Sequence, residues 1–145
     1  MMKPPEQVAF IAGLLDVAGV FRTRNINTTV LPMVAAHSTR DDLLSLLAKQ
    51  TGTSVTEVKR NHSRFGCDEH CPDKHVHVQH SSLRWSVTGI RAGILIYNVL
   101  PYLVLQAEKA QEVLDATADA PFRKPTALAM EKLGWALPEG LLSDP

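Results

Sequence analysis

The hydrophobic and polar positions of the chain change period several times, and each change marks an expected element. Residues 5–18 are apolar at helical spacing, with prolines at the start and Gly19 at the end, which predicts a helix. Apolar and polar residues then alternate over 20–26, and 28–36 is rich in Val and Thr. Two strands joined by a turn at Asn27 are therefore expected.

The rest of the chain continues this pattern of helices and strands. A leucine-rich helix is expected after Ser38 or Thr39, either of which can cap it, and before Gly52, which can end it. The same reasoning predicts strands over 53–64 and 75–87, and helices over 89–100, 102–116 and 126–133.

The order of these elements predicts an α+β fold, in which a four-stranded antiparallel sheet carries helices on one face. Residues 1–118 form the expected domain, and residues 119–145 are expected to be a linker with a short C-terminal helix.

Small residues give the first helix a bare flank. Ala9, Ala12 and Gly13 allow a neighbouring backbone to approach closely. The neighbour is either the protein's own sheet or a second helix, and the pattern alone does not choose between them.

Composition places the chain among ordinary globular proteins. Of its 145 residues, 45% are hydrophobic, which suffices for a core without disulfides. We expect a cytoplasmic protein with no membrane partner, because the apolar runs are short or interrupted and the N-terminus lacks the features of a signal peptide.

Charge is neutral overall but unevenly distributed. Residues 20–95 carry ten basic and six acidic side chains, whereas residues 96–145 carry four and seven. Phosphate contacts are therefore expected in the middle of the chain. If the strands present one face outward, that face fits a DNA major groove and carries Arg22, Arg24, Lys59, Arg84 and His77.

Both cysteines and four of the six histidines lie within residues 67–80. Two thiolates and two imidazoles form a set that suits tetrahedral zinc. The proposed ligands are Cys67, Cys71, His75 and His77. The alternative is a polar loop whose histidines lie near phosphates.

Residues 11–19, with the sequence Ile-Ala-Gly-Leu-Leu-Asp-Val-Ala-Gly, resemble the nine-residue motif that names the LAGLIDADG homing endonuclease family. Residues 83–89 and 100–103, the latter Leu-Pro-Tyr-Leu, are similar to a second recurrent block of that family. The resemblance covers about residues 6–115. It implies an αββαββα domain whose motif helices pair and whose sheets straddle duplex DNA.

A single motif implies a homodimer. The pairing of motif helices then becomes the favoured explanation of the bare flank, with Ala9, Ala12, Gly13 and Asp16 at the interface. The resemblance also matches Arg40 to a basic position of the family, which adds it to the expected DNA contacts.

The same resemblance argues against catalysis. Family members carry a metal-binding acid where this chain has Ala18, and a basic residue where it has Gln106. A methyl group cannot bind Mg²⁺, and Asp16 lies about 200° away around the helix.

The leading hypothesis is therefore a dimeric, sequence-specific DNA-binding protein that has lost cleavage and acts as a regulator or structural partner. One alternative is an active endonuclease that uses Asp16 and Mg²⁺. Another is a protein- or RNA-binding module on the same fold.

The zinc hypothesis predicts about one zinc ion per chain in protein purified without added metal, measured by elemental analysis. Cys71→Ser should lower that content sharply. A metal content far below stoichiometric that does not change on this substitution would remove the site.

Overall fold

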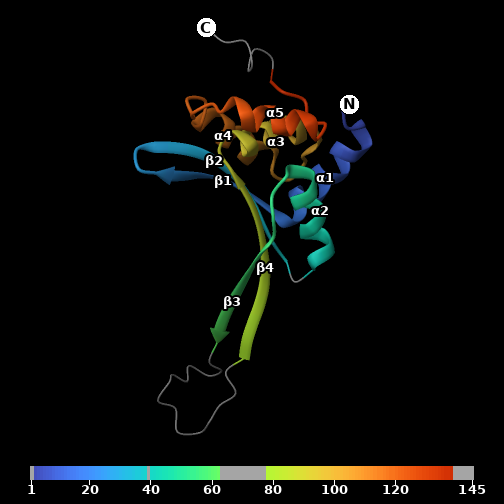
Figure 1. Ribbon diagram of the computed structural model, residues 1–145, viewed down its shortest axis with the longest axis vertical. Coiled ribbons are helices and arrows are strands. Elements are labelled where there is room, and N and C mark those ends of the chain that lie inside the picture. The colour runs from blue at the N-terminus through green and yellow to red at the C-terminus, as the bar shows by residue number, and fades with distance from the viewer. Residues whose placement is uncertain (1, 39, 63–77, 139–145) are drawn as a thin grey trace, which may run out of the picture.

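The computed structural model describes residues 2–38, 40–62 and 78–138, and for 58–62 and 78–82 it describes the backbone alone. Within these residues a four-stranded antiparallel sheet carries its helices on one face, which confirms the expected α+β class. Figure 1 shows the helices gathered together, with the β1–β2 hairpin projecting to one side and the β3–β4 hairpin projecting away from them. None of the described helices is long and apolar enough to cross a membrane.

The helices are separated by two hairpins. In chain order the elements are α1 (Pro5–Ala18), β1 (Gly19–Ile26), β2 (Thr29–Ser38), α2 (Asp41–Thr51), β3 (Thr56–His62), β4 (Val78–Thr88), α3 (Ile90–Val99), the 3₁₀ turn η2 (Leu100–Tyr102), α4 (Ala107–Ala116) and α5 (Lys124–Lys132).

The sheet has the strand order β1-β2-β4-β3, so the two hairpins meet at the β2–β4 pair. Asn27 has a φ of 58° and forms the predicted turn between β1 and β2. Alternation then places Phe21, Val34 and Val87 on the helix side, where all three are buried.

Helix α3 lies at the centre of the core. Almost every turn of it is buried, and it packs against α1, α4 and α5 as well as against β2 and β4. Such a helix is apolar over most of its surface because only a narrow strip of it, at Tyr97, is exposed to solvent. The other helices bury one stripe each, as Val8, Ile11, Ala12 and Leu15 do on α1.

Gly19 joins α1 to β1 through a close approach rather than through a left-handed conformation. Gly19 ends the helix as expected, and its φ of −92° is not left-handed. A Cβ atom at this position would lie 2.7 Å from the carbonyl oxygen of Leu15, closer than Cβ atoms come to other atoms in proteins. Only glycine lets β1 leave the helix at this angle.

Two expected helix starts differ from the structure. Helix α2 has Arg40 at its N-cap, with Ser38 instead accepting a hydrogen bond from the Arg40 backbone N–H at 2.9 Å. Helix α4 begins at Ala107 and not near 102, because Pro101 lies in the 3₁₀ turn and the next backbone N–H groups bind Asp16.

The C-terminal end of α2 collects hydrogen bonds from distant parts of the chain. The Trp135 indole donates to the Gln50 carbonyl at 2.7 Å, and the Arg91 guanidinium donates to that of Thr51. The Trp85 indole donates to the hydroxyls of Thr51 and Thr53 at 3.1 Å each. Both tryptophans are buried and belong to the core.

The segment after residue 118 packs into the same core. Ala127, Met130 and Trp135 are buried in it, and Asn98 of α3 exchanges hydrogen bonds with the backbone of Ala136. Within residues 119–138, this segment contains the short helix α5 and packs against the main body.

Candidate nucleic-acid interface

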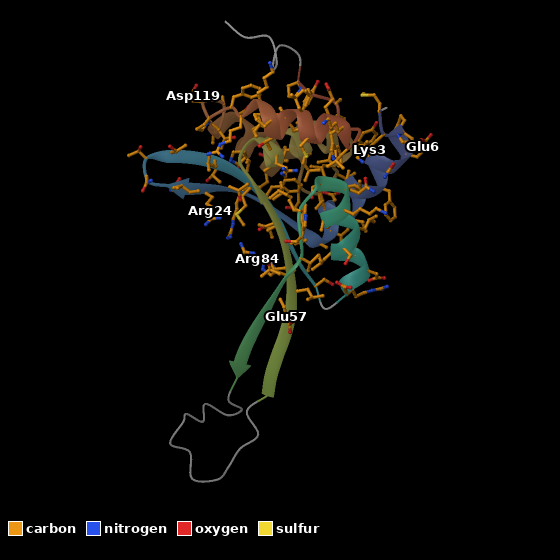
Figure 2. All side chains as sticks on the ribbon, viewed as in Figure 1. Lys3, Glu6, Arg24, Glu57, Arg84 and Asp119 are labelled. Carbon is orange, nitrogen blue, oxygen red and sulfur yellow. The ribbon has the colours of Figure 1, made fainter. Side chains whose placement is uncertain are left out.

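The face of the sheet turned away from the helices carries a basic hollow, which we call the arginine face. Alternation from Gly19 places Arg22 and Arg24 on this side of β1, and the register places Arg84 and Ser86 on the same side of β4. The hollow has a volume of about 590 Å³. Figure 2 shows Arg24 and Arg84 directed into the space between the two hairpins.

The described residues that line the arginine face include three arginines and no carboxylate; they are Arg22, Thr23, Arg24, Asn25, Met33, Thr56, Arg84 and Ser86. The nearest acid on β3, Glu57, occupies the alternate register position opposite Leu83. The lining of this hollow therefore has a net positive charge.

Arg84 lies near the middle of the arginine face, where β4 pairs with both β2 and β3. Its Nε atom is buried and has no hydrogen-bond partner among the described residues. A buried donor without a partner costs about 1–3 kcal/mol. Because this Nε atom is enclosed by protein, an external acceptor can reach only the parts of Arg84 that line the hollow. Arg22 and Arg24 are exposed, and no described residue forms an ion pair with either.

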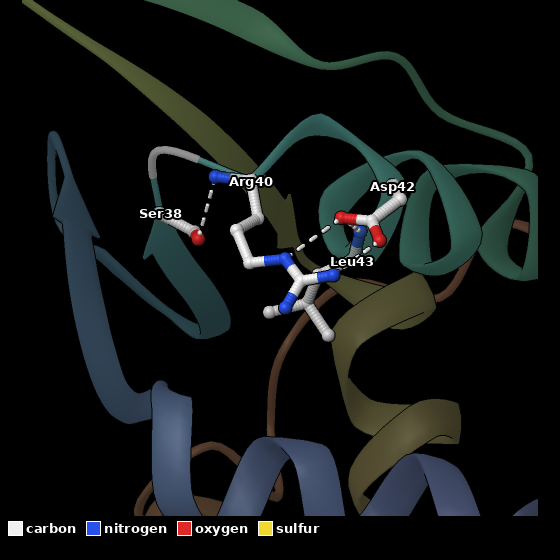
Figure 3. Close-up of polar contacts among 4 residues, drawn as sticks. All are labelled: Ser38, Arg40, Asp42 and Leu43. Atoms are coloured by element: carbon white, nitrogen blue, oxygen red, sulfur yellow. Dashed lines mark hydrogen bonds and ion pairs between the residues drawn. The ribbon is translucent and has the colours of Figure 1, made fainter.

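Two further predicted DNA contacts, Lys59 and Arg40, are not among the described residues that line this hollow. Lys59 lies farther along β3, opposite Ser81, and its side chain is outside the described part. Arg40 lies at the start of α2, where its Nη2 atom is 2.7 Å from Asp42, with a second contact of 3.2 Å from Nε (Figure 3). Asp42 thus neutralises the Arg40 charge, although both side chains are exposed.

Asp16 lies at the C-terminal end of α1, and both oxygens of its carboxylate accept hydrogen bonds. It accepts the backbone N–H groups of Val104, Leu105 and Gln106 at 2.8–2.9 Å. These donors, Leu105 first, hold the pKa of Asp16 below its ordinary value, against the opposite effect of burial. In this arrangement Asp16 anchors the start of α4.

Gln106 in turn donates hydrogen bonds from its side chain to the end of α1. Its side-chain nitrogen lies 2.8–3.1 Å from the carbonyl oxygens of Leu15, Asp16 and Gly19. The Leu15 carbonyl also accepts the backbone N–H of Gly19, which caps the helix. We call this reciprocal set the Asp16–Gln106 clamp. It occupies the end of α1 that also carries Ala18, the position where the resemblance implies an acid.

The predicted dimer residues divide into two groups. Ala12 and Asp16 are buried within the chain itself, and Ala9 is half-buried. Gly13 is exposed, and a Cβ added to it would meet nothing within 4 Å. The bare flank therefore faces the protein's own core at Ala12 and solvent at Gly13.

Sequence reasoning did not single out the exposed apolar residues beside Gly13. Phe10 is 58% and Val17 is 81% exposed, and with Gly13 they follow the spacing i, i+3, i+7 that places them on one helix face. Val104 and Leu105, which the clamp holds beside the end of α1, are 80% and 74% exposed. We call these five residues the apolar stripe.

The four predicted zinc ligands, Cys67, Cys71, His75 and His77, lie outside the described residues. Within the described ranges, no group of three or more His, Cys, Asp or Glu side chains is placed to hold a metal ion. The zinc site remains a prediction from the sequence.

The clamp predicts how Asp16→Asn changes stability. Because its pKa is lowered on folding, ionised Asp16 stabilises the folded state at neutral pH, and this contribution is lost as the pH falls through the lowered value. We expect Asp16→Asn to lower the Tm at pH 7 by about 5–10 °C, and the difference from wild type to shrink below the ordinary pKa of 3.8.

Asp119→Asn is the matched control, since Asp119 is exposed and its loss should change the Tm little at any pH. Thermal unfolding followed by circular dichroism between neutral and acidic pH measures both variants. A difference for Asp16→Asn that stays constant with pH would contradict a role for the carboxylate charge.

Comparison of the sequence with protein-family models finds no match, and comparison with curated proteins finds none either.

Proposed function

We propose that the protein binds duplex DNA across the arginine face, as a homodimer, and does not cleave it. The observation that carries the proposal is the set of three arginines, free of ion pairs among the described residues, around a hollow without lining carboxylates. Guanidinium groups match phosphate oxygens and the acceptor edge of guanine in geometry and charge.

The shape of the sheet supports this partner over a small molecule. The β1–β2 and β3–β4 hairpins project from the helical body in different directions, so the arginine face lies between two arms (Figure 1). A major groove is wide enough for a two-stranded β-ribbon. Arg22 and Arg24 lie two residues apart on β1, so both can follow one strand of a duplex.

The end of α1 supports binding without cleavage. Ala18 offers no oxygen ligand, Asp16 already accepts three backbone N–H groups, and the Gln106 amide is bound to backbone carbonyls. If Asp16 bound a divalent metal, the hydrogen bonds by which it joins α1 to α4 would be lost. The protein then serves as a regulator or a structural partner of its DNA site.

The apolar stripe supports the homodimer. Glycine in a helix interior costs about 1 kcal/mol relative to alanine, and no contact of Gly13 within the protomer requires it. A second α1 helix packed across Gly13 explains its absent side chain and covers Phe10 and Val17. The groove between α1 and α2 beside Phe10, lined by Leu14, Leu43 and Leu46, extends the same apolar surface.

The proposal predicts a duplex sequence that the protein selects from a random pool and binds with steep salt dependence. Arg84→Gln should reduce the slope of log affinity against log salt by about one per protomer, hence about two per dimer. Arg84→Lys keeps the charge but not the two-pronged donor geometry, so it should retain most of the slope and lose sequence preference. Fluorescence anisotropy over a salt series measures each variant.

Arg40→Gln provides the comparison, because Asp42 already neutralises that side chain and its loss should leave the slope nearly unchanged. Incubating the selected duplex with Mg²⁺ or Mn²⁺ tests cleavage, and metal-dependent strand breaks would contradict the proposal. Equal, shallow salt dependence for all variants would instead favour a protein-binding module, and preference for RNA an RNA-binding one.

The apolar stripe predicts that Val17→Arg converts a dimer into a monomer, because a charge at the centre of the interface cannot be desolvated. Val17 is 81% exposed in the protomer, so the fold itself should be unaffected. Sedimentation velocity at micromolar concentration measures the change. Leu128→Arg on α5, also at an exposed apolar position, should remain dimeric; a monomeric wild-type protein, with and without duplex, would refute the interface.

A further inference from the structure

A second basic hollow continues the arginine face beyond Arg24. It has a volume of about 490 Å³ and lies where the β1–β2 turn, the β4–α3 junction and the start of α5 meet. Its lining residues are Arg24, Ile26, Asn27, Thr29, Leu31, Thr88, Gly89, Ile90, Arg91, Pro121, Arg123 and Thr126. Arg24 lines both hollows, so they form one continuous surface.

Three arginines from distant parts of the sequence line this second hollow, and among the residues that the structure describes no acidic one does. Arg91 is occupied, since its guanidinium donates to the Thr51 carbonyl and contacts the Met130 sulfur at 3.7 Å. Arg24 and Arg123 are exposed, and neither side chain forms a hydrogen bond or ion pair with another described residue. These two guanidinium groups are therefore available to a ligand.

Arg123 brings the C-terminal segment of the chain to this hollow. Arg123 lies directly before α5, in the C-terminal segment that the motif resemblance does not cover. Burial of Ala127 and Met130 in the core fixes α5, so the backbone of Arg123 is held beside β4 and α3. A fixed arginine at the edge of an open basic surface suits a phosphate of an extended chain.

We infer that the DNA backbone runs from the arginine face across the second hollow, where Arg24 and Arg123 each contact a phosphate outside the region read by Arg22 and Arg84. This inference rests on the proposed DNA-binding function and adds the C-terminal segment to the interface. The hollow takes a backbone phosphate and not a free phosphate ion, because it is continuous with the arginine face through Arg24.

Two duplexes that share the selected core sequence test the inference, one trimmed to the core and one extended on both sides. Arg123→Gln should weaken binding to the longer duplex by roughly 3- to 10-fold and reduce its salt slope by about one per protomer. Binding to the trimmed duplex should not change. Lys132→Gln, at the other end of α5, is the matched control and should leave both affinities as they are.

The outcomes separate the inference from the function on which it rests. Wild-type binding to both duplexes with no effect of Arg123→Gln overturns the inference alone, whereas no duplex binding by the wild type overturns both. Titration of inorganic phosphate into wild type and Arg123→Gln provides a further arm. Specific phosphate binding that the substitution abolishes, with duplex binding unaltered, assigns the hollow to a free phosphate and overturns the inference.

Discussion

The Asp16–Gln106 clamp is the interaction on which the arrangement of the other elements depends. The Asp16 carboxylate at the end of α1 accepts three N–H groups of the turn before α4, and the Gln106 amide at the N-cap of α4 donates to carbonyls at the end of α1 and at Gly19. Asp16 is buried and Gln106 is half-buried, so these hydrogen bonds are partly shielded from water, although Val17, Val104 and Leu105 beside them are exposed. Helix α1 and the turn before α4 are thereby fixed relative to each other.

Which side chains of β1 face the core is determined at the same end of α1. Gly19 both ends α1 and begins β1, and its close contact with Leu15 sets the direction in which the strand leaves. From there, alternation alone determines that Phe21 enters the core and that Arg22 and Arg24 face outward. A change of one residue at this junction would turn the arginines into the core, so the basic surface depends on the geometry of a helix end.

Local pattern was sufficient to predict most of the elements, because their signals lie within a few residues of one another. Prolines and Gly19 marked α1, Asn27 marked the first turn, and alternation marked the strands. The start of α4 could not be read in this way, since the group that binds its preceding N–H donors is Asp16, nearly ninety residues earlier. The pairing of Arg40 with Asp42 could not be predicted either, because it depends on the rotamers of the two side chains. The closeness of Arg123 to Arg24 could not be predicted because it results from the packing of α5 on α3.

The sequence separation of the clamp also has a consequence for how the chain reaches its native state. Asp16 and its partners are 88 to 90 residues apart, and Lys3 donates its backbone N–H to Gly134 across a still longer stretch. Contacts of this range close large loops and slow folding. During synthesis, α1 leaves the ribosome long before Gln106 exists, so its C-terminal carbonyls and the Asp16 carboxylate stay hydrated until most of the protein has been made. The N-terminal helix is thus among the first segments translated and the last to acquire its final contacts.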